Sequence, residues 1–496
     1  MIKKKKVAII GCGVSGLAAG KIFKQIGHDI VILERSHDLG GVWEASVSYP
    51  DVQTQSPKEL YRYTDKAMPE EYPEWPKGPQ VYDYLNGYAN DYQLRDNIQF
   101  NAVVKNMARR KDDKPGWTLG ISTNGGDTVK QDFDFVCICS GQFSQKNIIT
   151  HDGQDAFIKA GGQVMHSSEY KDPNILTDKH VTVLGFSKSA TDIAVNAVKA
   201  NAKSVNLVYR KSVWRIPYFI GGLINFKNIL YIRKQENMFQ AWGLTKWDKF
   251  KYAIATPFIW ANWRGLESLL TIQLKLNKTG LRPTTKIEDD INCSVPIVTP
   301  GFFDLVAKGN INTVQGTYQS YQTDQISLTG GEKLPTDISI LAVGYKLGIP
   351  YLPQEYRDKL IEHDGQYRLH RIIANPDLPD MGFIGFNSSF CTVLAAEMGA
   401  NWLVRYADGM LANQPSNQEM TDNIEMNLDW RRTKRPAAKV YGGLCSAPFH
   451  FKHFDELLDD MGAKIRKRNV IAENMAPPNA DAYGRYLKST VQYKAE

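Results

Sequence analysis

Two glycine-containing turns are the residues of this chain with the clearest capacity for chemistry. The first is GCGVSG at residues 11–16, which follows a β-branched run and begins a helical pattern. Gly11 permits a tight turn, Gly13 lets the backbone approach a pyrophosphate, and Gly16 permits close packing of helix on strand. The N–H groups and partial positive charge at the start of the helix then suit a phosphate.

An acidic residue completes this first unit. The pattern predicts a strand at 6–10, a helix at 13–26 and a second strand at 28–33, which ends in Glu34. A carboxylate in that place can accept hydrogen bonds from both hydroxyls of a ribose. Strand, glycines, helix and terminal acid together predict a dinucleotide-binding βαβ unit. They also argue against a secretory signal peptide at the N-terminus.

A second, altered turn occurs in VTVLGFSKSATDIA, residues 181–194. Gly185 can provide the turn, and Ser187 stands where a second glycine is expected. Ser187 adds only a hydroxymethyl group, and Ala190 is small enough for a helix to pack on a strand. The sequence therefore predicts a second phosphate-binding turn at the start of a second βαβ unit.

The two units differ where their second strands end. The second unit has Arg210-Lys211 after the strand 204–209, where the first unit has Glu34. An acid favours a free ribose 2′-hydroxyl, whereas an arginine suits a 2′-phosphate through its charge and its bidentate fork. The second turn is therefore predicted to bind NADPH. The alternative is that Arg210 and Lys211 are solvated surface charges.

The loop after Glu34 indicates which nucleotide the first unit binds. Leu39-Gly40-Gly41-Val42-Trp43 follows the acid after a short gap. A pair of glycines there resembles flavoproteins with two dinucleotide-binding domains, in which it lies along FAD. The resemblance implies FAD at the first turn; the alternative is an ordinary surface turn.

Composition limits the class of protein. The chain has 496 residues, 43% hydrophobic residues and a formal net charge of +7, which fits two or three soluble domains. The basic residues are scattered, so dedicated nucleic-acid binding is not expected. The six cysteines include no CxxC pair and no zinc-like cluster with histidine. We expect reduced cysteines, a cytoplasmic location and no metal site.

Further motifs resemble the flavin-containing monooxygenases, a group of class B flavoprotein monooxygenases, over roughly residues 5–410. The family signature matches at Gly162, His166 and Tyr170 in GGQVMHSSEYKD. Ala160 stands in place of the signature phenylalanine, and Phe157 is the nearest candidate. Tyr170, where Baeyer–Villiger enzymes usually have tryptophan, favours the flavin-containing monooxygenase branch.

Three other segments carry the same resemblance. ISILAVGYK resembles the family's ATGY segment, with Val343 in place of threonine, and NPDLPDMGFIGF resembles the segment that closes the FAD domain. VQTQSPKELY resembles the element beside the flavin, with Thr54 and Lys58 kept and Gln55 in place of asparagine. The motif style is similar to the plant-type branch.

The resemblance implies an α/β fold with two dinucleotide-binding, Rossmann-like domains, a discontinuous FAD domain and a helical insertion. The insertion is expected to cover a site, to present a surface, or to hold only a small core of its own. The expected FAD domain comprises residues 1–168 and 336–445, the NADPH domain 169–215 and 296–335, the insertion or cap 216–295, and a C-terminal tail 446–496.

The resemblance also implies a chemistry and a set of site residues. NADPH reduces FAD, and O₂ adds at the flavin C4a position to give a (hydro)peroxide that oxygenates nitrogen or sulfur of a small organic substrate. Gln55 and His166 are the candidate catalytic residues, although Gln55 could serve packing and His166 a hinge. The expected FAD contacts are Gly11, Gly13, Ser15, Gly16, Glu34, Arg35, Gly40, Gly41, Val42, Trp43, Thr54, Val104, Ser140 and Gly141. The expected NADP contacts are Gly185, Ser187, Ser189, Ala190, Arg210, Lys211, Gly344 and Tyr345.

Three alternatives to this function stay open at the level of the sequence. They are Baeyer–Villiger oxidation of ketones, an NADPH oxidase or flavin reductase without an organic substrate, and a flavoprotein that uses 216–295 to dock on a membrane or a partner. The expected partners are a small-molecule substrate and O₂. The sequence leaves peripheral membrane contact and a homo-dimer open.

Overall fold

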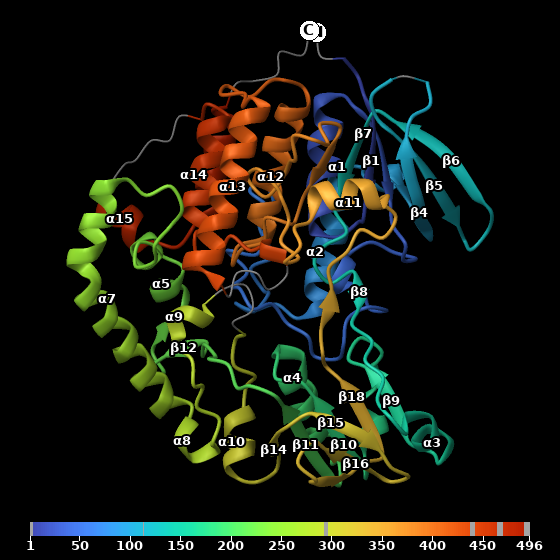
Figure 1. Cartoon of the computed structure of the whole chain (residues 1–496), viewed down its shortest axis with the longest axis vertical. Helices are drawn as coiled ribbons and strands as arrows, with labels where there is room; N and C mark the ends of the chain where they lie inside the picture. The colour runs from blue at the N-terminus through green and yellow to red at the C-terminus, as the bar shows by residue number, and fades with distance from the viewer. Residues whose placement is uncertain (1–2, 113, 292–295, 437–441, 464–469, 491–496) are drawn as a thin grey trace.

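The computed structural model describes residues 3–112, 114–291, 296–436, 442–463 and 470–490. Two parallel sheets lie in separate lobes, with the C-terminal helices beside the first lobe and a long helix along one outer edge (Figure 1). This is the predicted α/β class with two Rossmann-like domains. Among the described helices, none is long and apolar enough to cross a bilayer.

The first sheet has the strand order β20-β7-β1-β2-β3, and all its pairs are parallel. Alternation along β1 divides the core: Val7 and Ile9 pack in the cluster that contains α1, whereas Ala8 and Ile10 pack toward the antiparallel sheet β4-β5-β6. Burial on both faces explains the continuous apolar run of this strand. The bounds are β1 Lys6–Ile10, α1 Val14–Ile26, β2 Asp29–Leu33, β3 Ile98–Gln99, β4 Ala102–Arg109, β5 Trp117–Thr123, β6 Thr128–Phe133, β7 Phe135–Ile138 and β20 Met381–Phe383.

The second sheet has the order β14-β11-β10-β18-β9, again entirely parallel. Helix α4 covers it, and a small antiparallel sheet β15-β16-β17 adjoins it. The bounds are β9 Gln163–His166, β10 His180–Leu184, α4 Lys188–Lys199, β11 Ser204–Tyr209, β14 Asn312–Gln315, β15 Tyr318–Tyr321, β16 Gln325–Leu328, β17 Lys333–Pro335 and β18 Ile338–Leu341.

The membership of this second sheet differs from the expected domain boundaries. The boundaries at 168 and 336 leave β9 and β18 in the FAD domain, but β18 pairs with both β10 and β9 in the second sheet. The chain crosses between the lobes through the antiparallel ribbon of β8 (Gln145–Lys146) and β19 (Tyr345–Lys346). Partners distant in sequence determine which sheet β9 and β18 belong to. We therefore propose that the boundary between the two domains lies at this ribbon.

The insertion is mainly helical, as predicted, and is dominated by α7, Lys246–Gln273. Thr245 and Asp248 form a capping box at its start. Its second half is anchored through buried residues such as Trp263 and Leu270, and in its first half the hydroxyl of Tyr252 donates to the carbonyl of Met238 at 3.1 Å. The remaining bounds are β12 Phe219–Ile220, β13 Ile224–Asn225, α5 Lys227–Leu230, α6 Arg233–Glu236, α8 Leu276–Thr279 and α9 Ile287–Asp290.

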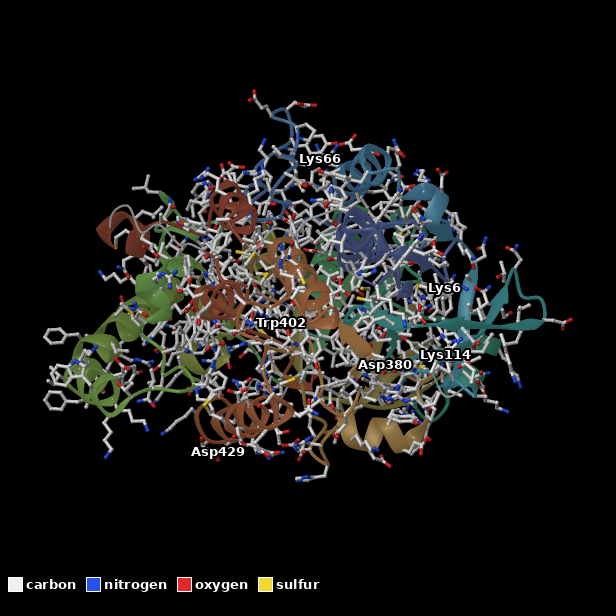
Figure 2. The ribbon with its side chains drawn as sticks, turned by 90° about the horizontal axis from the view of Figure 1, so that it is seen from above. Lys6, Lys66, Lys114, Asp380, Trp402 and Asp429 are labelled. Atoms are coloured by element: carbon white, nitrogen blue, oxygen red, sulfur yellow. The ribbon has the colours of Figure 1, made fainter. Side chains whose placement is uncertain are left out.

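The C-terminal part is more helical than the sequence suggested. The sequence predicts one helix in the tail, at residues 454–465. The structure places it earlier, as α14 (His450–Asp460), which packs on α12, whose Trp402 is fully buried among the packed side chains (Figure 2). The other bounds are η1 Gly41–Trp43, α2 Gly78–Asp91, η2 Arg95–Asn97, α3 Gln154–Lys159, η3 Pro173–Leu176, α10 Phe302–Ala307, α11 Gln354–Leu360, α12 Thr392–Ala407, α13 Asn417–Lys434, α15 Val470–Met475 and α16 Ala480–Lys488.

The cysteines correct one expectation. Cys12, Cys137, Cys139 and Cys391 are free and buried, as expected of core thiols. Cys445 is disulfide-bonded, which contradicts the expectation that all the cysteines are reduced; its partner lies outside the described residues. Pairing between cysteines distant in sequence cannot be deduced from spacing alone.

Candidate cofactor-binding sites

The first turn is closed by contacts that only glycine allows. Gly11 has a φ of +107°, and a Cβ there would lie 2.6 Å from the carbonyl oxygen of Cys139. A Cβ on Gly16 would lie 1.9 Å from the carbonyl oxygen of Gly11. Gly13 is the N-cap of α1, so the turn leads directly into the helix N-terminus.

The glycine pair after Glu34 packs directly on this turn. The N–H of Gly40 donates to the carbonyl of Cys12 at 3.0 Å. A Cβ on Gly41 would lie 3.1 Å from the Cα of Gly13. The structure therefore brings the two glycine-rich segments together at the end of β1, as the predicted FAD site requires.

Glu34 is buried beside the same turn. Its Oε2 accepts the N–H of Cys12 at 2.7 Å, and its Oε1 accepts the N–H of Ser36 at 2.9 Å. A carboxylate has about four lone-pair positions, so it keeps capacity for ribose hydroxyls. Arg35, the next predicted contact, donates to the carbonyl of Ser144 at 2.7 Å.

The remaining predicted FAD residues lie on elements around the first sheet. Trp43 is buried and donates from Nε1 to the hydroxyl of Tyr61 at 2.8 Å, whereas Val42 is exposed. Val104 is buried on β4, and Ser140-Gly141 follows β7 closely. Thr54 is 1% exposed, and its Oγ1 has no hydrogen-bond partner among the described residues. A glycine-lined turn with a buried, unpartnered hydroxyl fits a flavin nucleotide.

Sequence reasoning missed one residue of this site. Gly385 follows β20, and a Cβ there would lie 2.1 Å from the Oγ of Ser15. The loop after β20 thus touches the first turn. The glycine two residues after a buried strand, in MGFIGF, was the available signal.

The second turn repeats this arrangement with its predicted changes. Gly185 has a φ of +135°, and a Cβ there would lie 2.3 Å from the carbonyl oxygen of Ala342. Ser187 is the N-cap of α4, and its Oγ lies 3.1 Å from the Oγ of Ser189. Ala190 is fully buried against the sheet. The altered fingerprint still forms a strand–turn–helix with an open helix N-terminus.

Arg210 and Lys211 directly follow β11, beside the second turn. Both residues are exposed, and neither side chain is hydrogen-bonded to any residue that the structure describes. Two unpaired cations at the end of the second strand are suitably placed for a 2′-phosphate.

A buried arginine that the sequence analysis did not identify supports the second turn. Arg215 is 1% exposed, and its Nη2 donates to the carbonyls of Phe186 and Ser187. Its Nη1 donates to the Oγ1 of Thr191 at 3.3 Å. Burial lowers the pKa of the Arg215 guanidinium to about 9, so the cation persists at neutral pH. Arg215 fixes the backbone of the turn from within the domain.

A hydrogen-bonded interface joins the two nucleotide sites. The hydroxyl of Tyr49, in the FAD domain, donates to Asp192 Oδ2 on α4 at 2.9 Å. The Thr299 hydroxyl donates to Asp192 Oδ1 at 2.5 Å, and Lys188 forms an ion pair with the same carboxylate. Lys171 donates to the carbonyl of Ser48 at 2.5 Å. The segment after Trp43 therefore contacts the helix that begins the second site.

The two candidate catalytic residues lie at the edges of this interface. The Nε2 of His166 lies 3.0 Å from the carbonyl of Gly344, and its Nδ1 lies 2.8 Å from the hydroxyl of Ser168. Burial lowers the pKa of His166, so the ring is neutral at pH 7. The ring also packs edge-on against Tyr345 at 5.1 Å. Gln55 is exposed and accepts the N–H of Ile297 at 3.0 Å.

The signature glycine is covered by an aromatic ring. A Cβ on Gly162 would lie 2.3 Å from the ring of Phe157, which is fully buried. Phe157 therefore provides the aromatic packing that Ala160 cannot. Tyr170, the last signature residue, is also fully buried.

No group of histidine, cysteine, aspartate and glutamate within the described ranges could hold a metal ion. The buried polar residues serve instead to fix backbone and interface geometry. The arrangement can bind two dinucleotides at neighbouring helix N-termini, and it offers little acid–base machinery of its own. Chemistry between such nucleotides depends on position, dielectric and exclusion of water.

Comparison with known proteins places the chain in a family. The family model "Flavin-binding monooxygenase-like" matches residues 4–472. A probable flavin-containing monooxygenase 1 of Arabidopsis thaliana is 28% identical, in an alignment that covers 97% of this chain and 96% of that protein.

Solved structures share the fold. S-allyl-L-cysteine S-oxygenase from Allium sativum has a TM-score of 0.62 at 18% identity, covering 94% of this chain and 90% of its own. OTEMO in complex with FAD and NADP has a TM-score of 0.64 at 16% identity, covering 86% of this chain and 91% of its own. Members of the matched family are FAD- and NADPH-dependent oxidoreductases. The chain belongs to the flavin-binding monooxygenase-like family.

Proposed function

We propose that this protein uses NADPH and O₂ to oxygenate nitrogen or sulfur of a small organic substrate, with FAD bound at the first turn. The observation that carries the proposal is the pair of phosphate-binding turns, Glu34 ending one unit and Arg210 the other, joined by the Tyr49–Asp192 hydrogen bond.

Each residue has a binding or positioning role in this proposal. The backbone around Gly13 and the carboxylate of Glu34 hold the FAD pyrophosphate and ribose, and Arg210 holds the 2′-phosphate of NADPH. The bound flavin supplies hydride acceptance and activation of O₂. His166, through its neutral ring, holds the carbonyl of Gly344 next to the β8–β19 ribbon, where the chain passes between the lobes. The Gln55 amide, which accepts the N–H of Ile297, faces the interface between the domains.

The function is tested by measuring NADPH consumption in air across thioethers, tertiary amines and ketones, with H₂O₂ assayed in parallel. We expect thioethers or amines to raise NADPH consumption with little H₂O₂, because oxygen is then delivered to the substrate. Product from cyclic ketones alone would instead establish Baeyer–Villiger oxidation. H₂O₂ equal to the NADPH consumed with every substrate would establish an oxidase.

A second proposal concerns location: α7 docks on an anionic membrane surface. Large apolar side chains are exposed along this helix, including Phe258 at 78% and Ile272 at 77%, and nearby Leu223 is 87% exposed. Lysines flank the exposed apolar residues at both ends, Lys246 and Lys249 at the start and Lys278 beyond the end. Exposed aromatic residues between lysines suit the interface of an anionic bilayer. Helix α7 lies at the outer edge of the molecule, where it can meet such a surface (Figure 1).

Liposome flotation tests this docking. We expect the protein to float with vesicles containing phosphatidylserine, and the double variant Phe258→Glu/Ile272→Glu to bind at least ~10-fold more weakly, because two apolar side chains that would enter the bilayer interface are replaced by charges repelled from the surface. Val129→Glu is the matched control, since Val129 is also exposed, at 59%, but lies on β6. Equal flotation of the double variant, or a dimer that the double variant disrupts, would contradict membrane docking.

A further inference from the structure

A small cavity with mixed polar and apolar lining lies between the insertion and the C-terminal helices, outside both nucleotide sites. Its volume is about 20 Å³, enough for one or two water-sized species. Its lining includes Trp242 of the insertion, Arg371 before β20, Asn427 and Arg431 of α13, Ser446, and His453 of α14. These residues come from four segments of the chain, so a ligand in the cavity would lie between all four segments.

Arg431 is a buried cation without a counter-ion. The residue is 5% exposed, and no hydrogen bond or ion pair joins its guanidinium to any part of the chain that the structure describes. Burial lowers the pKa of Arg431 to about 10, and no carboxylate opposes this shift. The group therefore stays charged at neutral pH in surroundings where an uncompensated charge is costly.

Glu456 also lines the cavity, and its carboxylate and that of nearby Asp460 are already paired with other groups. Arg371 is bonded to Glu456 at 2.7 Å and to Asp460 at 2.9 and 3.0 Å. Glu456 also accepts the indole N–H of Trp242 at 2.8 Å, and Asp460 accepts that of Trp402 at 2.9 Å. Lys452 forms an ion pair with Glu456 at 3.0 Å, so two carboxylates face two cations and the charge of Arg431 remains in excess.

His453 offers a second donor at the same cavity. Burial and two nearby arginines lower its pKa to about 3, so the imidazole is neutral. The amide nitrogen of Asn387 lies 3.2 Å from Nε2 and also donates to the carbonyl of Ala395 at 2.8 Å. Nε2 is therefore the acceptor, and the ring proton is placed on Nδ1. Nδ1–H has no partner among the described residues.

We propose that this cavity binds a small monovalent anion of halide size, held by the guanidinium of Arg431 and the Nδ1–H of His453. An anion would neutralise the excess charge and satisfy both donors. Trp242 and Trp430 form an apolar wall, with ring centroids 5.1 Å apart, which excludes larger hydrated ions. The ion would tie the insertion to the C-terminal helices. This site is independent of the proposed oxygenation.

The test is thermal unfolding of the full FAD-loaded chain at constant ionic strength, with sodium gluconate replaced stepwise by sodium bromide. Gluconate is too large for the cavity. We expect the unfolding midpoint to rise saturably with bromide, by roughly 2 °C or more, because only the folded state binds the ion. A bromide-soaked crystal should give an anomalous peak within hydrogen-bond distance of Arg431.

Variants separate this site from general salt effects. Arg431→Met keeps much of the side-chain volume without charge, so it should lose the bromide response and, in gluconate, unfold no earlier than the wild type. Arg431→Lys should need more bromide for the same shift. Arg432→Met is the matched control and should respond as the wild type does, because Arg432 pairs on the surface with Glu362 and Asp364.

Two results would overturn the proposal. A bromide response that persists in Arg431→Met would show that the effect arises elsewhere. The second result is an unfolding midpoint of the wild type that does not change with bromide, together with a crystal that shows only water in the cavity or a hydrogen bond from Arg431 to the unpartnered Oε1 of Gln366. This result would show that no anion binds.

Discussion

Gly13→Ala should yield a folded but colourless protein. A Cβ on Gly13 meets no atom of the chain closer than 3.5 Å, the Cα of Gly41, so the chain itself tolerates the methyl group. The methyl group would occupy the space through which a pyrophosphate approaches the backbone. Losing two charge-assisted hydrogen bonds, at about 1.5–3 kcal/mol each, should weaken FAD binding at least ~100-fold. Absorbance near 450 nm after purification and FAD titration of the apoprotein measure this.

Two other glycine-to-alanine changes serve as controls for this experiment. Gly265→Ala on α7 meets no atom within 4 Å, so it should keep full FAD binding. Gly16→Ala places a Cβ 1.9 Å from a backbone oxygen and should lower the yield of folded protein as well as its FAD content. If Gly13→Ala were yellow and bound FAD as tightly as the wild type, the first turn would not hold the pyrophosphate.

The local parts of both sites could be predicted from the sequence. The first unit was expected as a strand at 6–10, a helix at 13–26 and a strand at 28–33, and the structure has 6–10, 14–26 and 29–33. These elements follow from apolar periodicity and from glycines within one stretch of chain. The contrast between an acid, Glu34, and a base, Arg210, could be recognised for the same reason, since each residue directly follows a strand beside its own turn.

The parts that depend on distant pairing could not be predicted. Strands β9 and β18 join the second sheet through partners far along the chain, so no local pattern assigns them to it. Tyr49 and Asp192 are separated by 143 residues, and only the packed lobes bring them together. Arg215 looks like any basic residue after a strand, yet it is buried beneath the second turn.

The insertion shows the same division between local and long-range information. Its helical character follows from its composition, and a capping box begins α7. Which side of the helix is buried depends on what it packs against, and here Trp247, Phe250 and Phe258 of the first half stay exposed. Composition alone left open whether these aromatic side chains cover a site, present a surface or form a small core.

Arg210→Ala should change the choice between the two nicotinamide nucleotides. One charge-assisted hydrogen bond to the 2′-phosphate contributes about 1.5–3 kcal/mol, so the Kd for NADPH should rise ~10–100-fold. NADH lacks that phosphate, so its Kd should stay within about 2-fold. Because Arg210 is exposed, the loss should be smaller at high salt. Nucleotide binding can be measured by fluorescence titration, and the rate of flavin reduction with each nucleotide is a second readout.

Lys203→Ala is the matched control for Arg210→Ala, because Lys203 is an exposed cation just before β11, at the opposite edge of the same sheet. It changes the net charge equally and should leave both nucleotides unaffected. Arg210→Ala/Lys211→Ala should lose more NADPH affinity than the single variant, since both cations follow the strand at the phosphate position. Equal losses for NADPH and NADH in Arg210→Ala would mean that the arginine contacts a part common to both, and the 2′-phosphate would then be recognised elsewhere.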